Sequence, residues 1–323
     1  MKASDLSSGR PFAAAIGYLS RYRSTLERDA TTAQRQPSVG LHKGAAATRQ
    51  PAAEPQDAFA RWAALQAWSS DATNRLDEQR DLAFWEHVAD DYDAGALAYR
   101  VPAVLDRVRS LVPANASVLD VGAGTGLFAL ALASHASTVT ALDYSPAMLA
   151  VLERKLLQQP AIANVRPILA RWEDALVEPH DVVLAANALY RTVDLRLALG
   201  KMVAVARQRG IIVWSVGRQD APQHTLRERV QPGHYRPGPD YVHVVEALFD
   251  LDVFAHVEMI QVDDTQHYAS DSDAAEGLLS WAPISADEHA AVARLLPHLL
   301  EPDGSGWRWR RRGRIAVIWW DHE

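Results

Sequence analysis

The fold is decided by residues 118–148, which read VLDVGAGTGLFALALASHASTVTALDYSPAM. The stretch opens with a short apolar run typical of a buried strand and then turns at three glycines. An apolar helix-like segment follows over about 127–133, and a second strand-like run over 138–142 ends in Asp143. This order of strand, turn, helix and strand is the pattern of a nucleotide-binding βαβ crossover. The glycines occupy alternate positions: Gly122, Gly124 and Gly126.

The spacing of the glycines discriminates between ligands. Dinucleotide-binding turns prefer GxGxxG, whereas this turn reads GxGxG and has Leu127 where the last glycine would lie. Asp120 precedes the first glycine by two residues, where a carboxylate would repel a pyrophosphate and would suit a ligand with an ammonium group. Asp143 can accept hydrogen bonds from a ribose diol. The pattern therefore favours a nucleoside ligand with a cationic group.

An acid two residues before GxGxG, a second acid that closes the next strand and the run LDYSPAML together resemble the class I S-adenosylmethionine-dependent methyltransferases. The resemblance covers residues 85–216 well and the rest weakly. It implies S-adenosyl-L-methionine as the cofactor, with Asp143 on the ribose hydroxyls and Asp120 on the amino-acid end. An ordinary βαβ turn with incidental glycines is the alternative. The implied contacts in this region are Asp120, Gly122, Gly124, Gly126, Asp143, Tyr144 and Met148.

Two later segments add cofactor contacts through the same resemblance. Residues 171–174 follow the third strand, where family members place one residue against the adenine and an acid near its amino group; this implies Trp172 and Glu173. The family often has Asp at the position of Arg171, so the chain departs from it there. Asn187 follows the fourth strand in a loop that would face the methyl group. Its sequence, ANALY, is not the Asn-Pro-Pro-Tyr signature, which leaves the quinone-biosynthesis-like group of small-molecule enzymes.

Strands and helices continue to alternate with short links, which predicts an α/β fold with a doubly wound sheet. The resemblance implies seven strands in a Rossmann-like methyltransferase sheet, with strands six and seven forming the antiparallel edge. Gly210 is expected to stop a helix that begins at Asp194. The later strands are expected over residues 165–169, 181–186, 211–216, 255–262 and 314–320. The later helices are expected over residues 146–158, 241–251, 274–281 and 287–300, the last two as an insertion before the final strand.

Residues 1–56 differ in composition from the rest of the chain. Small and polar residues dominate, Pro37, Pro51 and Pro55 interrupt, and eight Lys/Arg stand against four Asp/Glu. We expect a disordered basic arm, with a mitochondrial transit peptide as the alternative. Residues 57–112 are expected to form a helical lid and substrate region, and residues 113–323 the methyltransferase core with an insertion at about 271–305.

Aromatic residues mark a helix expected over residues 75–90. The helix ends in the run FWEHVADDYD, and a similar segment lies over the cofactor in small-molecule methyltransferases. The resemblance therefore implies a lid that contains Trp85 and Tyr92, with packing in the core as the alternative. Tyr92 and His87 are the candidate catalytic residues. Three further histidines, each with an ordinary packed or surface role as the alternative, lie in or next to the segment after strand five: His224, His234 and His243.

Composition narrows the range of functions. The chain has 323 residues, 48% hydrophobic content and no cysteine. Disulfides, cysteine-based zinc sites and thiol nucleophiles are therefore excluded, and we expect no metal. A formal charge of −7 disfavours nucleic acid as a partner. No apolar run reaches the length of a membrane span, so we expect a cytoplasmic protein without membrane contact.

The predicted function is transfer of a methyl group to a small organic acceptor by in-line displacement. This reaction needs positioning and exclusion of water more than it needs catalytic side chains. One alternative is an RNA or protein methyltransferase that uses the basic arm and the arginines from Arg308 to Arg314, although the entry to the last strand is the favoured interpretation of that run. The other alternative is a non-catalytic S-adenosylmethionine-binding protein. The acceptor, its reacting atom, a general base and the oligomeric state stay open.

Overall fold

The computed structural model describes residues 57–69, 77–95, 102–216, 222–230, 236–279 and 286–322. The chain divides into two units, Met1–Pro55 and Gln56–Glu323, and every described residue belongs to the second unit. The arm predicted over residues 1–56 lies outside the described residues, as do His234 and the side chain of His224. Within the described ranges, no helix has the length and apolar character that crossing a membrane requires.

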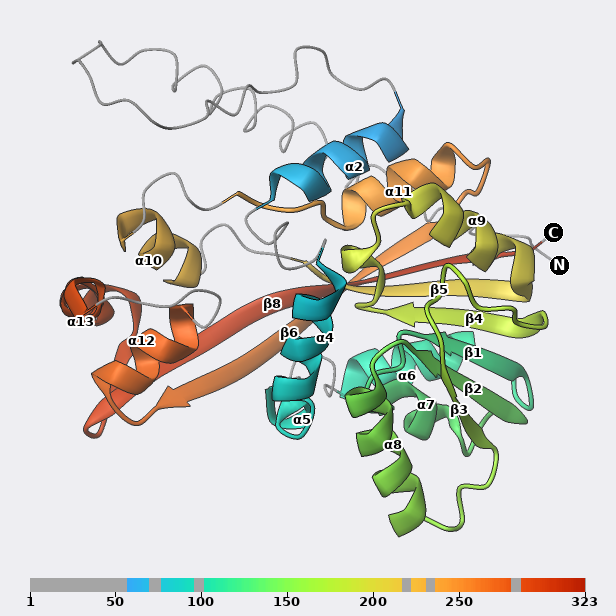
Figure 1. The fold of residues 1–323 in the computed structure, drawn as a ribbon, viewed down its shortest axis with the longest axis horizontal. Helices are drawn as coiled ribbons and strands as arrows, with labels where there is room; N and C mark the ends of the chain where they lie inside the picture. Colours follow the sequence, from blue (N-terminus) through green and yellow to red (C-terminus); the bar gives the residue numbers. More distant parts are fainter. Residues whose placement is uncertain are drawn as a thin grey trace, which may run out of the picture. The chain divides into compact units, whose positions relative to one another are not determined.

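A mixed sheet organises the second unit (Figure 1). Its strands are β1 Ser117–Val121, β2 Thr138–Asp143, β3 Val165–Leu169, β4 His180–Ala186, β5 Ala206–Val216, β6 His256–Tyr268, β7 Glu301–Asp303 and β8 Gly306–Asp321. Seven strands follow the order β3-β2-β1-β4-β5-β8-β6, and the short β7 pairs with β8 beside this path. The pairings among β1 to β5 are parallel, and β8 runs antiparallel to β5 and β6. The predicted Rossmann-like methyltransferase sheet is confirmed, with β6 and β8 as its antiparallel edge.

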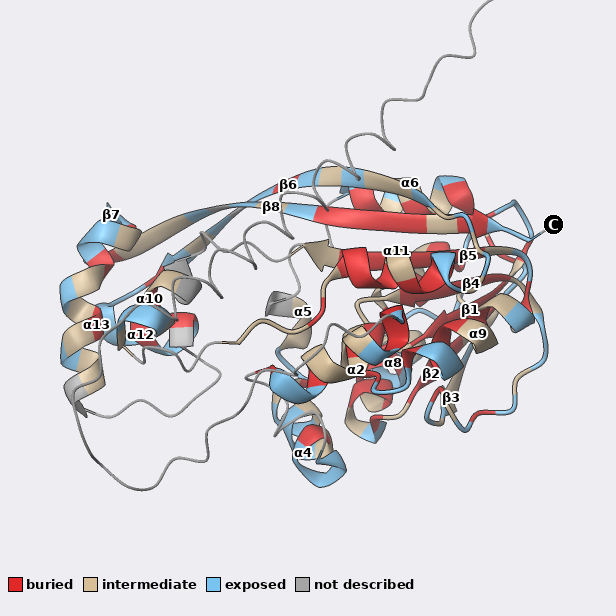
Figure 2. Cartoon of the chain, turned by 90° about the horizontal axis from the view of Figure 1, so that it is seen from above, coloured by how far each residue is buried: buried red, intermediate tan, exposed pale blue. Residues whose placement is uncertain are grey.

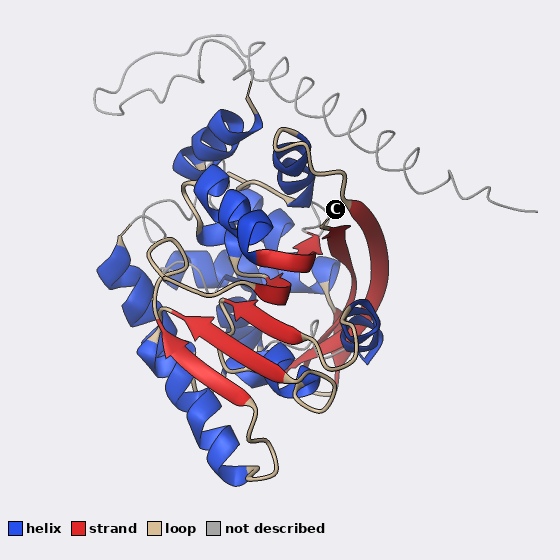
Figure 3. Cartoon of the chain, turned by 90° about the vertical axis from the view of Figure 1, so that its right-hand side faces the viewer, coloured by secondary structure: helices blue, strands red, loops and turns tan. Residues whose placement is uncertain are grey.

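Helices lie on both sides of this sheet (Figure 3). They are α2 Ala58–Trp68, α4 Glu78–Val88, α5 Tyr92–Gly95, α6 Pro102–Leu111, α7 Leu127–Leu132, α8 Pro146–Gln158, η2 Leu189–Arg191 (a 3-10 turn), α9 Leu195–Val205, α10 Pro222–Val230, α11 Tyr241–Phe249, α12 Asp271–Leu279 and α13 Ala286–Leu299. Local sequence sets several starts, because Asp57, Ser145 and Asp194 each accept a backbone N–H at the N-cap. Helices α6 and α7 contact each other, and α2, α9 and α11 form a second group of contacting helices.

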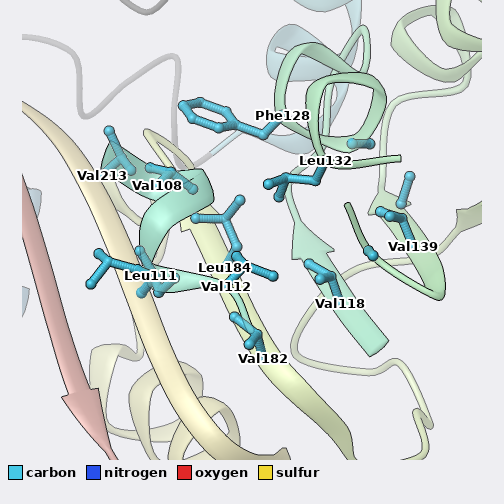
Figure 4. Packing of buried hydrophobic residues seen from close by; sticks show 14 of the residues in the cluster. Val108, Leu111, Val112, Val118, Phe128, Leu132, Val139, Val182, Leu184 and Val213 are labelled. Carbon is cyan, nitrogen blue, oxygen red and sulfur yellow. The ribbon is translucent and has the colours of Figure 1, made fainter. Parts of the chain in front are cut away.

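The main core lies between α6, α7 and the central strands (Figure 4). Val108 of α6 and Phe128 and Leu132 of α7 gather over Val118 of β1 and Leu184 of β4, and all five side chains are buried. The strands supply continuous apolar runs because both faces of a parallel sheet are covered. This packing holds the carboxyl end of β1, where the glycine turn begins, on a rigid base.

The prediction that Gly210 stops a helix is wrong. The helix α9 ends at Val205 and β5 begins at the next residue, with Gly210 paired to Val183 on one side and to Trp320 on the other. A Cβ at Gly210 would lie 2.0 Å from Cζ2 of Trp320. The glycine is therefore needed for close packing of the β8 tryptophan on the strand, and strand five is longer than the predicted 211–216.

The antiparallel edge extends well beyond its predicted bounds. Pairing between β6 and β8 runs in one register from His256↔Trp319 to Tyr268↔Trp307. The predicted helical insertion is present as α12 and α13, and together with α10 these helices form a second core around Leu226, Leu278 and Leu296. Figure 2 shows that β8 is buried near β5 and mostly half-buried or exposed farther along. The hairpin thus connects two separate hydrophobic cores.

Candidate functional site

The glycine turn after β1 is shaped by close packing. All three glycines have positive φ, at 69°, 54° and 85° for Gly122, Gly124 and Gly126. A Cβ at Gly122 would lie 2.4 Å from Cβ of Ala188, and one at Gly126 would lie 2.3 Å from Cδ1 of Leu152. Gly124 differs, because its nearest neighbour would be the flexible Met148 side chain at 3.2 Å. Packing alone thus requires the outer two glycines, and the middle one is where a ligand has room to approach.

Asp143 ties the end of β2 to this turn. Its Oδ2 accepts the backbone N–H of Gly124 and its Oδ1 accepts that of Ser145, both at 2.8 Å. Burial raises the pKa of the carboxyl, and hydrogen bonds from Ser145, Gly124 and Tyr144 partly oppose this shift. Each carboxylate oxygen can accept more than one hydrogen bond. The predicted contact with two ribose hydroxyls therefore stays chemically available.

Asp120 is the most constrained acid of the site. Its side chain is buried, and its Oδ2 has no hydrogen-bond partner among the described residues. Burial, and then the charge of Asp143, raise the pKa of Asp120 to about 7, while a backbone hydrogen bond from Ala129 acts in the opposite direction. A buried carboxylate oxygen without a donor is costly. The ammonium group of S-adenosylmethionine would stabilise it, so the acid and the glycine turn fit this cofactor.

The other predicted cofactor contacts divide into two groups. Met148 is buried at the start of α8 beside Gly124, and Asn187 follows β4 with a positive φ of 49°. Tyr144 lies next to Asp143 and donates its phenolic hydrogen to a lid residue, Asp81. These three residues border the glycine turn, and their predicted contacts with the cofactor stay predictions.

Trp172 and Glu173 lie after β3, and their placement differs. Trp172 is buried, and its indole N–H donates to the carbonyl of Ala198 in α9 at 3.1 Å. The indole is therefore engaged in packing under α9, and its predicted contact with adenine stays a prediction. Glu173 is half-buried, and Lys201 donates to its backbone carbonyl at 3.4 Å. The predicted role of its carboxylate is likewise untested.

The aromatic residues predicted for a lid pack beside the glycine turn. Trp85 and Tyr92 form an edge-to-face pair with centroids 5.8 Å apart and pack against Met148 and Val151 of α8. Burial, and then the charges of Asp143 and Asp93, raise the pKa of Tyr92. The predicted roles of Tyr92 and Trp85 over the cofactor stay predictions. The other candidate catalytic residue, His87, is exposed on α4.

His243 has a structural role that its sequence position did not reveal. Its ring accepts the backbone N–H of Asp240 at 3.0 Å, which completes a capping box at the start of α11. Burial lowers its pKa, which favours the neutral ring that such an acceptor needs. The histidine thus stabilises a helix terminus.

Acidic residues of α4, α5 and the turn between them form ion pairs with basic residues of the core. Sequence reasoning missed these pairs. Glu78 meets Arg171 at 3.0 Å, Asp93 meets Lys155 at 2.5 Å, and Asp93 also accepts from Thr125 in the glycine turn at 2.6 Å. Two more ion pairs join the same segments to the core: Asp81 with Arg191, and Asp90 with Arg154. We call these the lid ion pairs. The sequence held a weak signal, six acids spread over residues 78–93, but nothing in it identified which four form ion pairs or with which partners.

Arg191, at the end of η2, pairs with Asp81, whose other carboxylate oxygen accepts from Tyr144. Its guanidinium carbon lies 4.7 Å from the ring centroid of Trp85, 5.2 Å from that of Phe84 and 5.4 Å from that of Tyr190. Such cation–π contacts strengthen when they are withdrawn from water. The loop that would face a methyl group therefore presents a fixed cation.

The arginines of the run from Arg308 to Arg314 lie on β8 and β6 pairs with them. Arg308 and Arg310 both pair with Glu301, at 2.9 and 3.4 Å. Their charges are thus partly balanced within the hairpin, as the strand interpretation requires. No group of His, Cys, Asp and Glu in the described ranges has a metal-binding arrangement.

A sequence model of the family described as "Methyltransferase domain" matches residues 118–210. This chain carries a class I methyltransferase domain. The match runs from β1 into β5 and includes the glycine turn, Asp120 and Asp143. The family prediction is confirmed, and S-adenosyl-L-methionine is the cofactor of that family.

Three known proteins define how far the similarity extends. An uncharacterized protein of Haemophilus influenzae is 31% identical over 157 residues, which is 47% of this chain and 56% of that protein. EEF1A lysine methyltransferase 2 of Mus musculus is 38% identical over 55 residues, 17% of this chain and 22% of that protein. The matches thus span about half the length of these curated relatives or less.

Structural similarity supports the same fold. The YcgJ protein from Bacillus subtilis aligns with a TM-score of 0.50 at 17% sequence identity, over 68% of this chain and 97% of that chain. At this level of identity the likeness concerns the fold alone. The two proteins therefore share the fold of the sheet, and the likeness does not extend to the methyl acceptor.

Proposed function

We propose that this protein is an S-adenosylmethionine-dependent methyltransferase that acts on a small organic acceptor. The single observation that carries the proposal is the buried Asp120 oxygen without a donor, beside a glycine turn that Asp143 closes. The cofactor would supply a methyl group already activated for displacement. The chain would then bind and orient both reactants and exclude water.

Roles follow from the position of each side chain. Asp143 accepts hydrogen bonds from the ribose, Asp120 balances the ammonium group, and Gly124 lets the ligand approach the backbone. Met148 borders the same turn, and Asn187 lies at the start of the acceptor loop. The proposal also includes Trp172, against the adenine, and Glu173, near the amino group of the adenine.

The region 57–112 is proposed to act as the lid of this site. Trp85 and Tyr92 pack against α8 beside the glycine turn, and the lid ion pairs join α4 and α5 to α8 and to the segments after β3 and β4. Closing a site in this way removes water from the reacting groups. A cytosolic location is part of the proposal, because a chain without cysteine suits a reducing compartment.

A small acceptor is favoured over RNA. Arg308 and Arg310 of β8 pair with Glu301, and the whole chain carries a formal charge of −7. RNA contacts by these arginines would make retention on RNA fall steeply with salt concentration. A non-catalytic binding protein is distinguished by binding S-adenosylhomocysteine without turnover on any acceptor.

Calorimetry with S-adenosylhomocysteine and NADH tests the proposal. We expect saturable heat with S-adenosylhomocysteine and none with NADH, because Asp120 suits an ammonium group and opposes a pyrophosphate. Tight NADH binding without S-adenosylhomocysteine heat would sink the assignment. The matched control is Asp181→Asn, an acid near the amino end of β1 that bonds Ser117 at 2.8 Å and lies away from the turn; it should leave both titrations unchanged.

A further inference from the structure

The helix α4 docks on the domain in an unusual way. All eleven of its residues are described, and the only one that is fully buried is a carboxylic acid, Asp81. Its aromatic residues are less buried, and Phe84 is 37% exposed. A helix that packs stably normally buries an apolar stripe. Asp81 is therefore the most deeply buried contact of α4 with the domain.

Asp81 contacts residues on both sides of the glycine turn. One carboxylate oxygen accepts the phenolic hydrogen of Tyr144, which follows β2, and the other pairs with Arg191, which follows β4. In the sheet β1 lies between β2 and β4, and the glycine turn follows β1. The carboxylate of Asp81 thus bridges the ends of the strands that flank the turn.

The backbone of the turn that carries Arg191 is held independently of α4, although the guanidinium itself contacts α4 residues. The carbonyls of its two neighbours are fixed from α2: Trp62 donates to Thr192 at 2.7 Å and Gln66 donates to Tyr190 at 2.6 Å. Trp62 is fully buried, and Gln66 is buried as well. The turn that carries Arg191 would therefore keep its conformation if α4 moved away.

We propose that Arg191 binds a carboxylate group of the methyl acceptor, and that Asp81 holds this position until the acceptor displaces it. The inference rests on the proposed function, because it assigns a chemical class to the acceptor of the same site. A guanidinium recognises a carboxylate through paired N–H donors. Displacing Asp81 takes a carboxylate from a guanidinium that is 16% exposed and that keeps its hydrogen bond to Tyr190, so a second carboxylate is the group that restores the charge pairing.

The surrounding rings narrow the class further. The Arg191 guanidinium is flanked by Phe84, Trp85 and Tyr190. Such rings favour a flat apolar body attached to the acid. The acceptor is therefore an aromatic or otherwise unsaturated carboxylic acid, and benzoate is a minimal probe, with benzamide as its neutral, equally shaped counterpart.

The test measures binding of benzoate and benzamide to the complex of the full chain with S-adenosylhomocysteine. We expect benzoate to bind wild type at least tenfold more tightly than benzamide does. Arg191→Gln should reduce benzoate affinity to the benzamide level, and Arg191→Lys should retain part of the preference. The matched control is Arg196→Gln, which removes an arginine that also pairs with an acid, Asp57, and stacks on a ring, Phe59; it should leave the preference intact.

Asp81→Asn provides a test that does not depend on the folding of the arginine variants. With its competitor removed, Arg191 should bind benzoate at least threefold more tightly, and benzoate should raise the melting temperature of this variant more than that of wild type. Equal binding of benzoate and benzamide, or a benzoate preference that survives Arg191→Gln, would overturn the inference. If the wild-type protein does not bind S-adenosylhomocysteine, the proposed function is overturned instead.

Discussion

The carboxylate of Asp143 accepts the backbone N–H of Gly124 at 2.8 Å, so the acid at the end of β2 and the middle glycine of the turn after β1 form one unit. We predict that Asp143→Ala weakens S-adenosylhomocysteine binding by about ten- to a hundredfold, because hydrogen bonds to an ionised acceptor contribute about 1.5–3 kcal/mol each. Asp143→Asn keeps one acceptor oxygen and should lose less. Calorimetry measures both, and an affinity for Asp143→Ala within threefold of wild type would exclude a ribose contact.

The raised pKa of Asp120 predicts a specific pH dependence of stability. Its folded-state pKa is about 7, above the ordinary value of 3.8, so the native state retains a proton that the unfolded chain releases. The stabilising contribution is therefore complete below about pH 4 and is lost as the pH rises through 7, with a slope of at most about 1.4 kcal/mol per pH unit. Urea unfolding of wild type and Asp120→Asn from pH 4 to 8 should show profiles that diverge over this range. Parallel profiles would show that Asp120 is ionised throughout.

Cofactor binding should release a proton from the same residue. An ammonium group near Asp120 favours the carboxylate, so binding lowers a pKa that burial had raised. At pH 6, the heat of S-adenosylhomocysteine binding should vary with the ionisation enthalpy of the buffer, and this variation should disappear in Asp120→Asn. Identical buffer dependence in the two proteins would assign the proton to another group.

The position of Tyr92 near Asp143 predicts a role in turnover. Tyr92→Ala should lower turnover more than it lowers stability, because it opens the lid over the site while the main core is untouched. Tyr92→Phe keeps the ring packed against Trp85 and separates the contribution of the hydroxyl. Turnover equal to wild type, together with a lower melting temperature, would return Tyr92 to a packing role.

The lid ion pairs predict selective opening of α4. Asp93→Asn removes partners of Lys155 and Thr125, so amide hydrogen exchange should accelerate in α4 and α5 and stay unchanged in α6, which belongs to the main core. Raising the salt concentration should act in the same direction on the wild type, because exposed pairs are screened. Equal acceleration in α4 and α6 would mean that the variant loosens the whole domain.

Sequence patterns predicted the parallel half of the fold well. Buried parallel strands appear as continuous apolar runs, and the Pro146 and Ser145 signals placed α8 correctly. The glycine turn and its two acids were identifiable because their chemistry is local. The antiparallel hairpin was underestimated, since arginines at alternate positions of β8 interrupt the apolar pattern where the strand leaves the core. The prediction for Gly210 was wrong because the sequence does not distinguish a glycine that ends a helix from one that makes room for a neighbouring aromatic ring, here that of Trp320.

Contacts between distant segments were beyond prediction from one sequence. Asp81 and Arg191 come from a helix and a turn far apart in the chain, and neither lies in a recognisable motif. The family resemblance implied a contact between Trp172 and adenine, and nothing in the sequence indicated that the indole N–H donates to the carbonyl of Ala198. Which way a large side chain turns depends on the volume its neighbours leave, and that volume is a property of the assembled core.

The uninterrupted pairing of β6 with β8 acts as a ruler between the two cores. Adding two residues to each strand would move the distal helices outward by about 7 Å, and every side chain would keep its face because strands repeat every second residue. The register at the base, where Ile318 of β8 meets Val257 of β6 and Ile212 of β5, would not change. Evolution can therefore adjust the reach of the distal helices in steps without disturbing the geometry around Asp120.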